Sequence, residues 1–171
     1  MQETDDGRYL CPDCYSREPR LLQGWHAHKG DFIFFGKNTL YSPLLFKGSS
    51  YLNIQGESNA PSEKTTTVNG SVVFGTAATQ PLLTGCNATH RMSTTIFNGP
   101  VSNLASGVNL TIKNWGTNTF NAGVCSAKGV EFSRYSEANP ENVNLIKGPV
   151  DVAGTLIVKN NSQVVLEGDS A

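Results

Sequence analysis

Glycine and proline interrupt the chain at short intervals, and this spacing constrains the fold more than any other feature. The 171 residues contain 17 Gly and 8 Pro, and no interval between them exceeds 13 residues. Both residues destabilise helix interiors, so the spacing excludes long helices. Between them, β-branched and aromatic residues recur in short runs such as DFIFF, SVVF, TTIF and QVVL, which are typical of strands. The pattern predicts an all-β fold of many short strands, arranged as a sandwich, a jelly-roll-like fold or a barrel.

The predicted strands fall into two regions separated by a polar stretch. The run FIFFGKNTLY predicts a β-hairpin, because its GKN segment at 36–38 tolerates positive φ between two apolar runs. Residues 55–67 have the composition of an exposed loop or linker. We therefore expect an irregular N-terminal arm with a hairpin over residues 1–54, and a β domain over residues 68–171.

A long tract of the chain is almost free of charge. Residues 65–130 contain no Asp or Glu, and their formal charges are limited to Arg91, Lys113 and Lys128. In this tract 33 of 66 residues are Gly, Ser, Thr or Asn, whereas a protein surface usually carries about a quarter charged residues. A neutral polar surface favours close contact with protein or sugar, because little charge must be desolvated. The alternative is an ordinary small β domain with a Thr/Asn-rich face.

A weak internal similarity links two segments of the predicted β domain. LTIKN at 110–114 and LIVKN at 156–160 are offset by 46 residues, and a glycine precedes each of them. A repeated strand-plus-turn unit would produce this similarity, and so would chance. Two matches of five residues do not predict a solenoid by themselves.

One cluster of residues has the composition of a metal site. Cys11 and Cys14 form a CxxC segment, and His26 and His28 follow as His-x-His. A tight turn lets two thiolates converge on one Zn²⁺, and two histidines at i and i+2 on a strand project to the same side. If zinc binds there, protein ligands fill all four positions, so the site would be structural and not catalytic.

The segment RYLCPDCY around these cysteines resembles the thiol knuckles of zinc-ribbon and zinc-finger proteins, over about eight residues. That resemblance implies structural zinc, although His-x-His departs from the usual spacing of the second ligand pair. Cys11 and Cys14 could instead form a local disulfide or remain free thiols. Cys86 and Cys125 are expected to be small buried residues, with a bridge between them as the less favoured alternative.

Overall charge and hydropathy argue against two classes of partner. The chain has 13 Lys and Arg against 14 Asp and Glu, and its basic residues are scattered singly, so a nucleic-acid footprint is not expected. No apolar run approaches the roughly 20 residues of a membrane helix, and the acidic start MQETDDGRYL does not resemble a signal peptide. These features predict a soluble protein, although a mature secreted fragment would look the same.

Signatures of catalysis are weak. GDSA at 168–171 resembles the Gly-Asp-Ser block of some serine hydrolases, but no chain follows it here to supply a helix or an oxyanion hole. The neutral tract offers His90 no acidic neighbour in sequence, and no phosphate-binding or dinucleotide-binding fingerprint is present. We expect a protein that is not an enzyme.

The charge-poor composition of residues 65–171 resembles that of virion accessory proteins, such as bacteriophage head-decoration or tail-associated proteins, and that of surface adhesins. The first resemblance implies a structural protein of the virion surface that forms homo-oligomers and docks on a larger assembly such as a capsid shell. The second implies a carbohydrate-binding module, in which Trp115 stacks on a sugar while Asn114 and Asn118 bind its hydroxyls. A weaker alternative is an adaptor whose zinc knuckle binds a partner.

Overall fold

The computed structural model of the chain describes a set of strands and their connections. The described segments are 2–3, 9–10, 25–27, 31–35, 37–55, 65–84, 94–114, 116–134 and 143–167. Side chains are described within these segments except at 2–3, 9–10, 25–27, 31, 35, 55 and 114.

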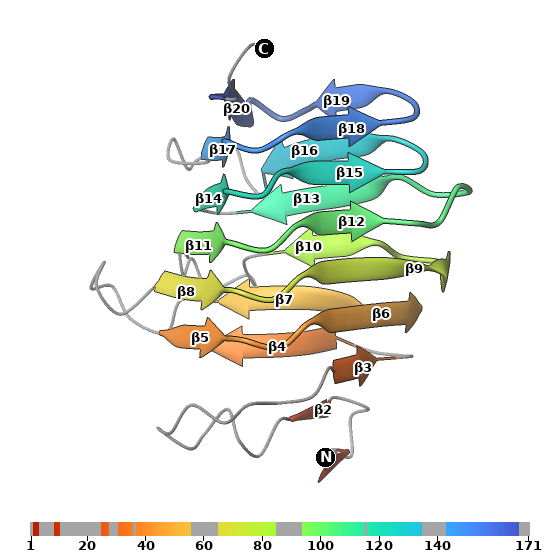
Figure 1. Cartoon of the computed structure of the whole chain (residues 1–171), viewed down its shortest axis with the longest axis vertical. Helices are drawn as coiled ribbons and strands as arrows, with labels where there is room; N and C mark the ends of the chain where they lie inside the picture. Colours follow the sequence, from red (N-terminus) through yellow and green to blue (C-terminus); the bar gives the residue numbers. More distant parts are fainter. Residues whose placement is uncertain are drawn as a thin grey trace.

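The described strands form three sheets that run side by side along the long axis of the molecule (Figure 1). Sheet A contains β1 (Gln2–Glu3), β2 (Tyr9–Leu10), β4 (Asp31–Phe35), β7 (Tyr51–Gln55), β10 (Leu82–Thr84), β13 (Leu110–Asn114), β16 (Val130–Arg134) and β19 (Leu156–Val158). Sheet C contains β5 (Asn38–Leu40), β8 (Thr65–Val68), β11 (Thr94–Phe97), β14 (Thr117–Phe120), β17 (Val143–Ile146) and β20 (Gln163–Leu166). Sheet B contains β3 (Trp25–Ala27), β6 (Leu44–Gly48), β9 (Val72–Ala78), β12 (Val101–Asn103), β15 (Val124–Ser126) and β18 (Val150–Val152).

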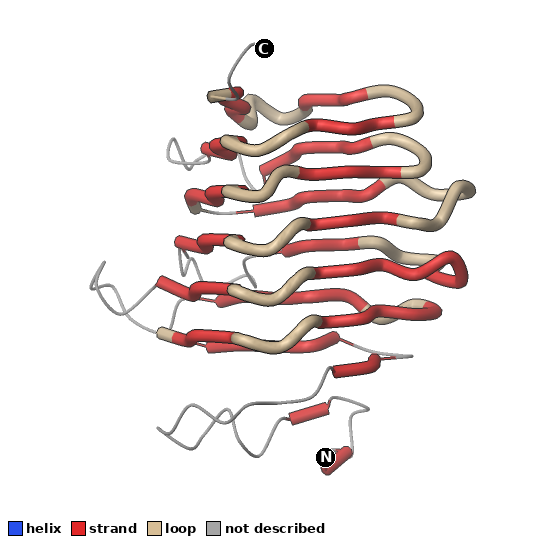
Figure 2. The backbone as a smooth tube through the Cα atoms, viewed as in Figure 1, coloured by secondary structure: helices blue, strands red, loops and turns tan. Residues whose placement is uncertain are grey.

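From β4 onward the chain visits the sheets in the fixed order A, C, B, and each round of three strands adds one coil to a parallel β-solenoid. Five complete coils follow one another, from β4–β5–β6 to β16–β17–β18, and β19 and β20 begin a sixth. Apart from the antiparallel pair of β1 and β2, every strand pair is parallel. Figure 2 shows strands and connecting segments alternating in the same way on successive coils.

This arrangement confirms the all-β prediction and corrects its architecture. The described residues contain no helix, but the strands form a solenoid, so the sandwich, jelly-roll-like and barrel predictions are wrong. The predicted hairpin over FIFFGKNTLY is also wrong, because β4 lies in sheet A and β5 in sheet C. Each of these strands pairs with the next coil instead. Turn residues between two apolar runs mark a corner here, not a reversal.

The pairing of strands runs across the predicted linker. β6 pairs with β9, although residues 55–67 separate them in the chain. Within that stretch, Thr65–Thr67 belong to β8, while residues 56–64 lie outside the described part. The coils before and after this segment therefore share the same three sheets.

The corners of the solenoid differ in how regular they are. The corner from sheet C to sheet B has three residues in each of the five complete coils: 41–43, 69–71, 98–100, 121–123 and 147–149. The connection from sheet A to sheet C ranges from two residues, at 36–37 and 115–116, to nine, at 56–64 and 85–93. This variable connection accounts for most of the irregular repeat length along the chain.

The interior is filled by columns of apolar side chains, one from each coil. Phe97 stacks on Phe120 with ring centroids 5.0 Å apart and planes 4° apart, and Phe46 stacks on Phe74 at 5.1 Å. All four rings are buried. Aromatic pairs of this kind contribute about 0.5–1.5 kcal/mol beyond their burial, so the columns hold successive coils in register.

A second interior column is polar. Thr66, Thr95, Asn118 and Asn144 occupy equivalent positions on neighbouring strands of sheet C and are buried. Asn118 Nδ2 donates to Asn144 Oδ1 at 2.8 Å, and Asn144 Nδ2 donates to Ser162 Oγ at 3.1 Å. The cavity beside Thr95 and Asn118 measures about 10 Å³, room for roughly one water. It is too small for an organic ligand.

Candidate interaction surface

The outward side chains on the six strands of sheet C are all uncharged. Along each strand side chains alternate between interior and exterior, and the burial patterns of β8, β11, β14 and β17 all read intermediate, buried, intermediate, buried. The strand registers align the outward residues in two columns. The first column is Thr65, Thr94, Thr117, Val143 and Gln163, and the second is Thr39, Thr67, Ile96, Thr119, Leu145 and Val165.

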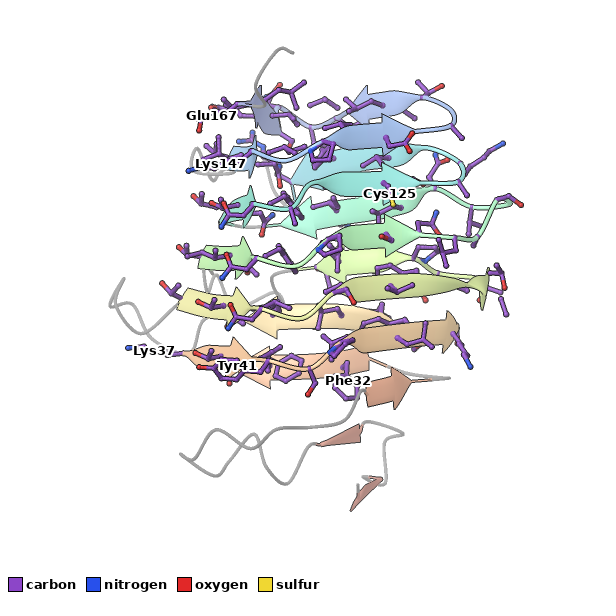
Figure 3. All side chains as sticks on the ribbon, viewed as in Figure 1. Phe32, Lys37, Tyr41, Cys125, Lys147 and Glu167 are labelled. Atoms are coloured by element: carbon purple, nitrogen blue, oxygen red, sulfur yellow. The ribbon has the colours of Figure 1, made fainter. Side chains whose placement is uncertain are left out.

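We call these eleven residues the C face. Adjacent strands lie about 4.8 Å apart and alternate residues of one strand about 6.6 Å apart, so the C face is a regular lattice of methyl and hydroxyl groups. Among the described residues beside the C face, Lys37, Lys147 and Glu167 are charged and lie at its borders (Figure 3). The other two sheets differ, since sheet A has Lys113 and Glu131 on its outer face.

An exposed ladder of asparagines borders the C face at the corner from sheet C to sheet B. Asn98 Nδ2 donates to Asn69 Oδ1 and Asn121 Nδ2 donates to Asn98 Oδ1, both at 2.7 Å. The backbone N–H of each of these residues donates to the last strand residue of the coil before, as Asn98 N does to Val68 O at 2.8 Å. Tyr41 occupies the same corner position on the first coil and is 52% exposed.

Glycines let these corners stack closely. A Cβ at Gly99 would collide with the carbonyl of Gly70 on the previous coil, and a Cβ at Gly70 would collide with the carbonyl of Ser42. A side chain does not fit at position 70 or 99, so glycine is required at both. The segments Asn69-Gly70 and Asn98-Gly99 occupy equivalent positions in their corners. This Asn-Gly pair, which recurs at two of the five corners, was a sequence signal of the coiled repeat.

The last coil leaves part of its apolar side chains uncovered. Leu156 and Val158 align with the fully buried Val130 and Phe132, yet they are 38% and 46% exposed. Leu166, aligned with the buried Ile146, is 61% exposed. No described strand pairs with the far edges of β18, β19 and β20.

Only part of the predicted zinc site can be located. His26 lies on β3 opposite Leu45, but its side chain is outside the described part. Cys11, Cys14 and His28 also lie outside the described residues. Within the described segments no group of three or more His, Cys, Asp or Glu could hold a metal ion. The zinc site stays a prediction, which native mass spectrometry of the purified protein would test by the mass of bound zinc.

Of the predicted sugar-binding residues, the structure describes the side chain of Asn118 alone. Asn118 is buried and donates its amide to Asn144, so its side chain does not lie on the surface where a glycan would bind. Trp115 lies outside the described residues, and Asn114 lies on β13 with its side chain undescribed. Sequence reasoning missed that residues 117–120 alternate with period two, which places Asn118 and Phe120 inside and Thr117 and Thr119 outside.

Of the remaining cysteines and histidines considered from the sequence, Cys125 is the one that lies in the described part of the chain. Cys125 is a free, partly buried thiol on the outer side of sheet B, where its Sγ lies 3.1 Å from Ser102 Oγ. Cys86 and His90 lie outside the described residues. The described part of the chain has no helix that could cross a membrane.

Comparison of the chain with protein-family models, with curated proteins and with solved structures finds no match in any of the three.

Proposed function

We propose that the protein is a non-enzymatic structural component that docks on a larger assembly, such as a virion, as a capsid-decoration or tail accessory protein. The observation that supports this function most directly is the C face. Eleven outward side chains on six strands carry no charge, and eight of them are only partly exposed. Such a surface can be buried against another protein without removing an ion from water.

The fold suits a structural role for a second reason. A solenoid presents the same corner and face on every coil, so its surfaces are extended and repetitive, and binding energy is distributed over many similar contacts. The interior cavity beside Thr95 has room for about one water. Recognition at the C face would therefore be an exterior event that involves several coils at once.

The test replaces outward residues of the C face by lysine. Ile96→Lys with Leu145→Lys should move the protein from the sedimenting particle fraction to the supernatant, because two charges would be buried without partners. Thr111→Lys on the outer face of sheet A is the matched control and should sediment like the unmodified protein. Unchanged sedimentation of the double variant, with its fold intact by circular dichroism, would contradict docking through this face.

A carbohydrate-binding module is the second candidate, and the asparagine ladder is the observation that favours it. Asn69, Asn98 and Asn121 hold their amides in a fixed row on the surface, and Tyr41 offers an exposed ring on the first coil of the same corner. Amides that hydrogen-bond hydroxyls beside an aromatic ring are typical of sugar sites.

A glycan array separates the two candidates. Trp115→Ala and Tyr41→Ala should each abolish glycan binding and leave the oligomeric state unchanged if the module binds sugar. No glycan binding by the unmodified protein would remove this candidate.

A third candidate, the zinc-knuckle adaptor, predicts that Cys11→Ser with Cys14→Ser costs partner binding while the solenoid stays folded.

A further inference from the structure

We infer that the C face binds the C face of a second copy of the chain, with a two-fold axis parallel to the long axis of the solenoid. This inference rests on the proposed function and names the partner of the same surface.

Charge makes the C face the surface best suited to self-association. A two-fold contact buries the same surface on both copies, so each charged group on that surface is removed from water twice. The outer side of sheet A carries Lys113 and Glu131, and that of sheet B carries Lys47 and Asp151. The two columns of the C face carry none, and self-contact there buries no ion.

Geometry favours a second copy over an unrelated surface. The C face repeats about every 4.8 Å along the solenoid and about every 6.6 Å along its strands. Sheets that pack face to face interdigitate their side chains at a distance of about 10 Å between sheets. The C face of another copy offers the same two spacings over six strands, so its side chains can interdigitate along the whole face.

The order of residue types sets the direction of the axis. All six threonines of the C face lie on β5, β8, β11 and β14, whereas β17 and β20 contribute Val143, Leu145, Val165 and Gln163. A two-fold axis parallel to the solenoid places the aliphatic end of one copy on the aliphatic end of the other. An antiparallel arrangement would place Val165 against the hydroxyl-rich end near Thr39, with less apolar contact.

The size of the C face sets the expected strength of the dimer. Six strands at about 4.8 Å and four residues at about 3.3 Å give a flat area of roughly 29 by 13 Å, or about 380 Å² on each copy. Stable interfaces bury about 800 Å² on each partner. The contact is therefore weak in solution and becomes appreciable at high local concentration.

Sedimentation equilibrium of the full chain tests the contact. The unmodified protein should show a reversible monomer–dimer equilibrium with a dissociation constant between about 10 μM and about 1 mM. Ile96→Lys should weaken dimerisation at least about tenfold, because the new charge would be buried without a partner. Thr111→Lys, on the outer face of sheet A, should leave the dissociation constant unchanged. A protein that stays monomeric up to millimolar concentration would overturn the inference.

Cysteine cross-linking tests the direction of the axis. The four native cysteines are replaced by serine, and Val165→Cys or Thr39→Cys is introduced at one end of the C face. With a short bismaleimide, each single variant should cross-link to itself in the parallel arrangement. Cross-linking only in a mixture of the two variants would overturn the parallel axis.

The outcomes also separate this inference from the proposed function. Suppose that the protein is monomeric but the double variant Ile96→Lys with Leu145→Lys is released from particles. The C face then binds a different protein, and a second copy of the chain is ruled out as its partner. If dimerisation is confirmed but neither variant affects particle association, the proposed docking function fails while the dimer contact stands.

Discussion

The inner and outer columns of sheet C come from alternate residues of the same strands, yet they differ in chemistry. The inner columns combine stacked rings such as Phe97 and Phe120 with a hydrogen-bonded polar row that includes Asn118 and Asn144. The outer columns hold six threonines, four aliphatic residues and Gln163, and none of these side chains is charged. We conclude that the inner columns determine stability and register, and that the outer columns are available for association. Substitutions on the two faces should therefore separate stability from binding.

The largest expected effect comes from the inner aromatic column. Phe120→Ala should lower the free energy of unfolding by about 3–5 kcal/mol, because Phe120 is fully buried and contacts rings on two sides. Chemical denaturation followed by circular dichroism measures this loss. A loss below about 1 kcal/mol would show that the coils are held together by something other than this column.

The inner polar column should have the next largest effect. Asn144→Ala removes the acceptor of Asn118 Nδ2 and leaves that buried donor unsatisfied, which costs about 1–3 kcal/mol. The same denaturation experiment measures the change, with Asn98→Ala on the exposed ladder as the matched control. Equal losses for the two variants would mean that burial does not distinguish the two asparagine rows.

On the outer face, a neutral substitution should change stability little. Thr119→Val keeps the shape of a partly exposed side chain and should alter the free energy of unfolding by about 0.5 kcal/mol or less. Thermal melts of this variant and the unmodified protein provide the comparison. A large destabilisation would show that the C face contributes to the folded monomer and would weaken the separation of roles.

The smallest effect is expected at the border of the C face. Lys147 Nζ lies 3.9 Å from Glu167 Oε2, and both side chains are about half exposed. Such ion pairs contribute little in water, so Lys147→Ala should cost less than about 0.5 kcal/mol, and this small cost should vanish at high salt. A larger, salt-insensitive loss would indicate that this corner is buried by another surface.

Part of this structure could be predicted from the sequence. The spacing of glycine and proline correctly indicated short strands and no long helices. The similarity of LTIKN and LIVKN was a true sign of the repeat, because β13 and β19 lie two coils apart in sheet A, with Leu110 and Leu156 both aligned with Val130. The solenoid was missed because connections such as 56–64 change the repeat length, so no fixed period appears.

The candidate surface could be predicted only in outline. The absence of acidic residues over 65–130 indicated a neutral contact surface, and part of that tract forms the C face. Composition could not tell which neutral residues face outward, since Asn118 and Thr119 are neighbours in sequence but lie on opposite sides of one strand. That distinction depends on strand register, which pairing with the adjacent coils determines.

The constant three-residue corner and the variable connection from sheet A to sheet C have a consequence for how such a chain can change. Residues inserted at 36–37 or 115–116 would lengthen one edge of the molecule without altering the pairing of any strand, because neighbouring coils already tolerate two to nine residues there. An inserted residue at 98–100 would displace a whole coil against its neighbours. New peptide segments are therefore best grafted along the first edge, where the solenoid would display them in a row.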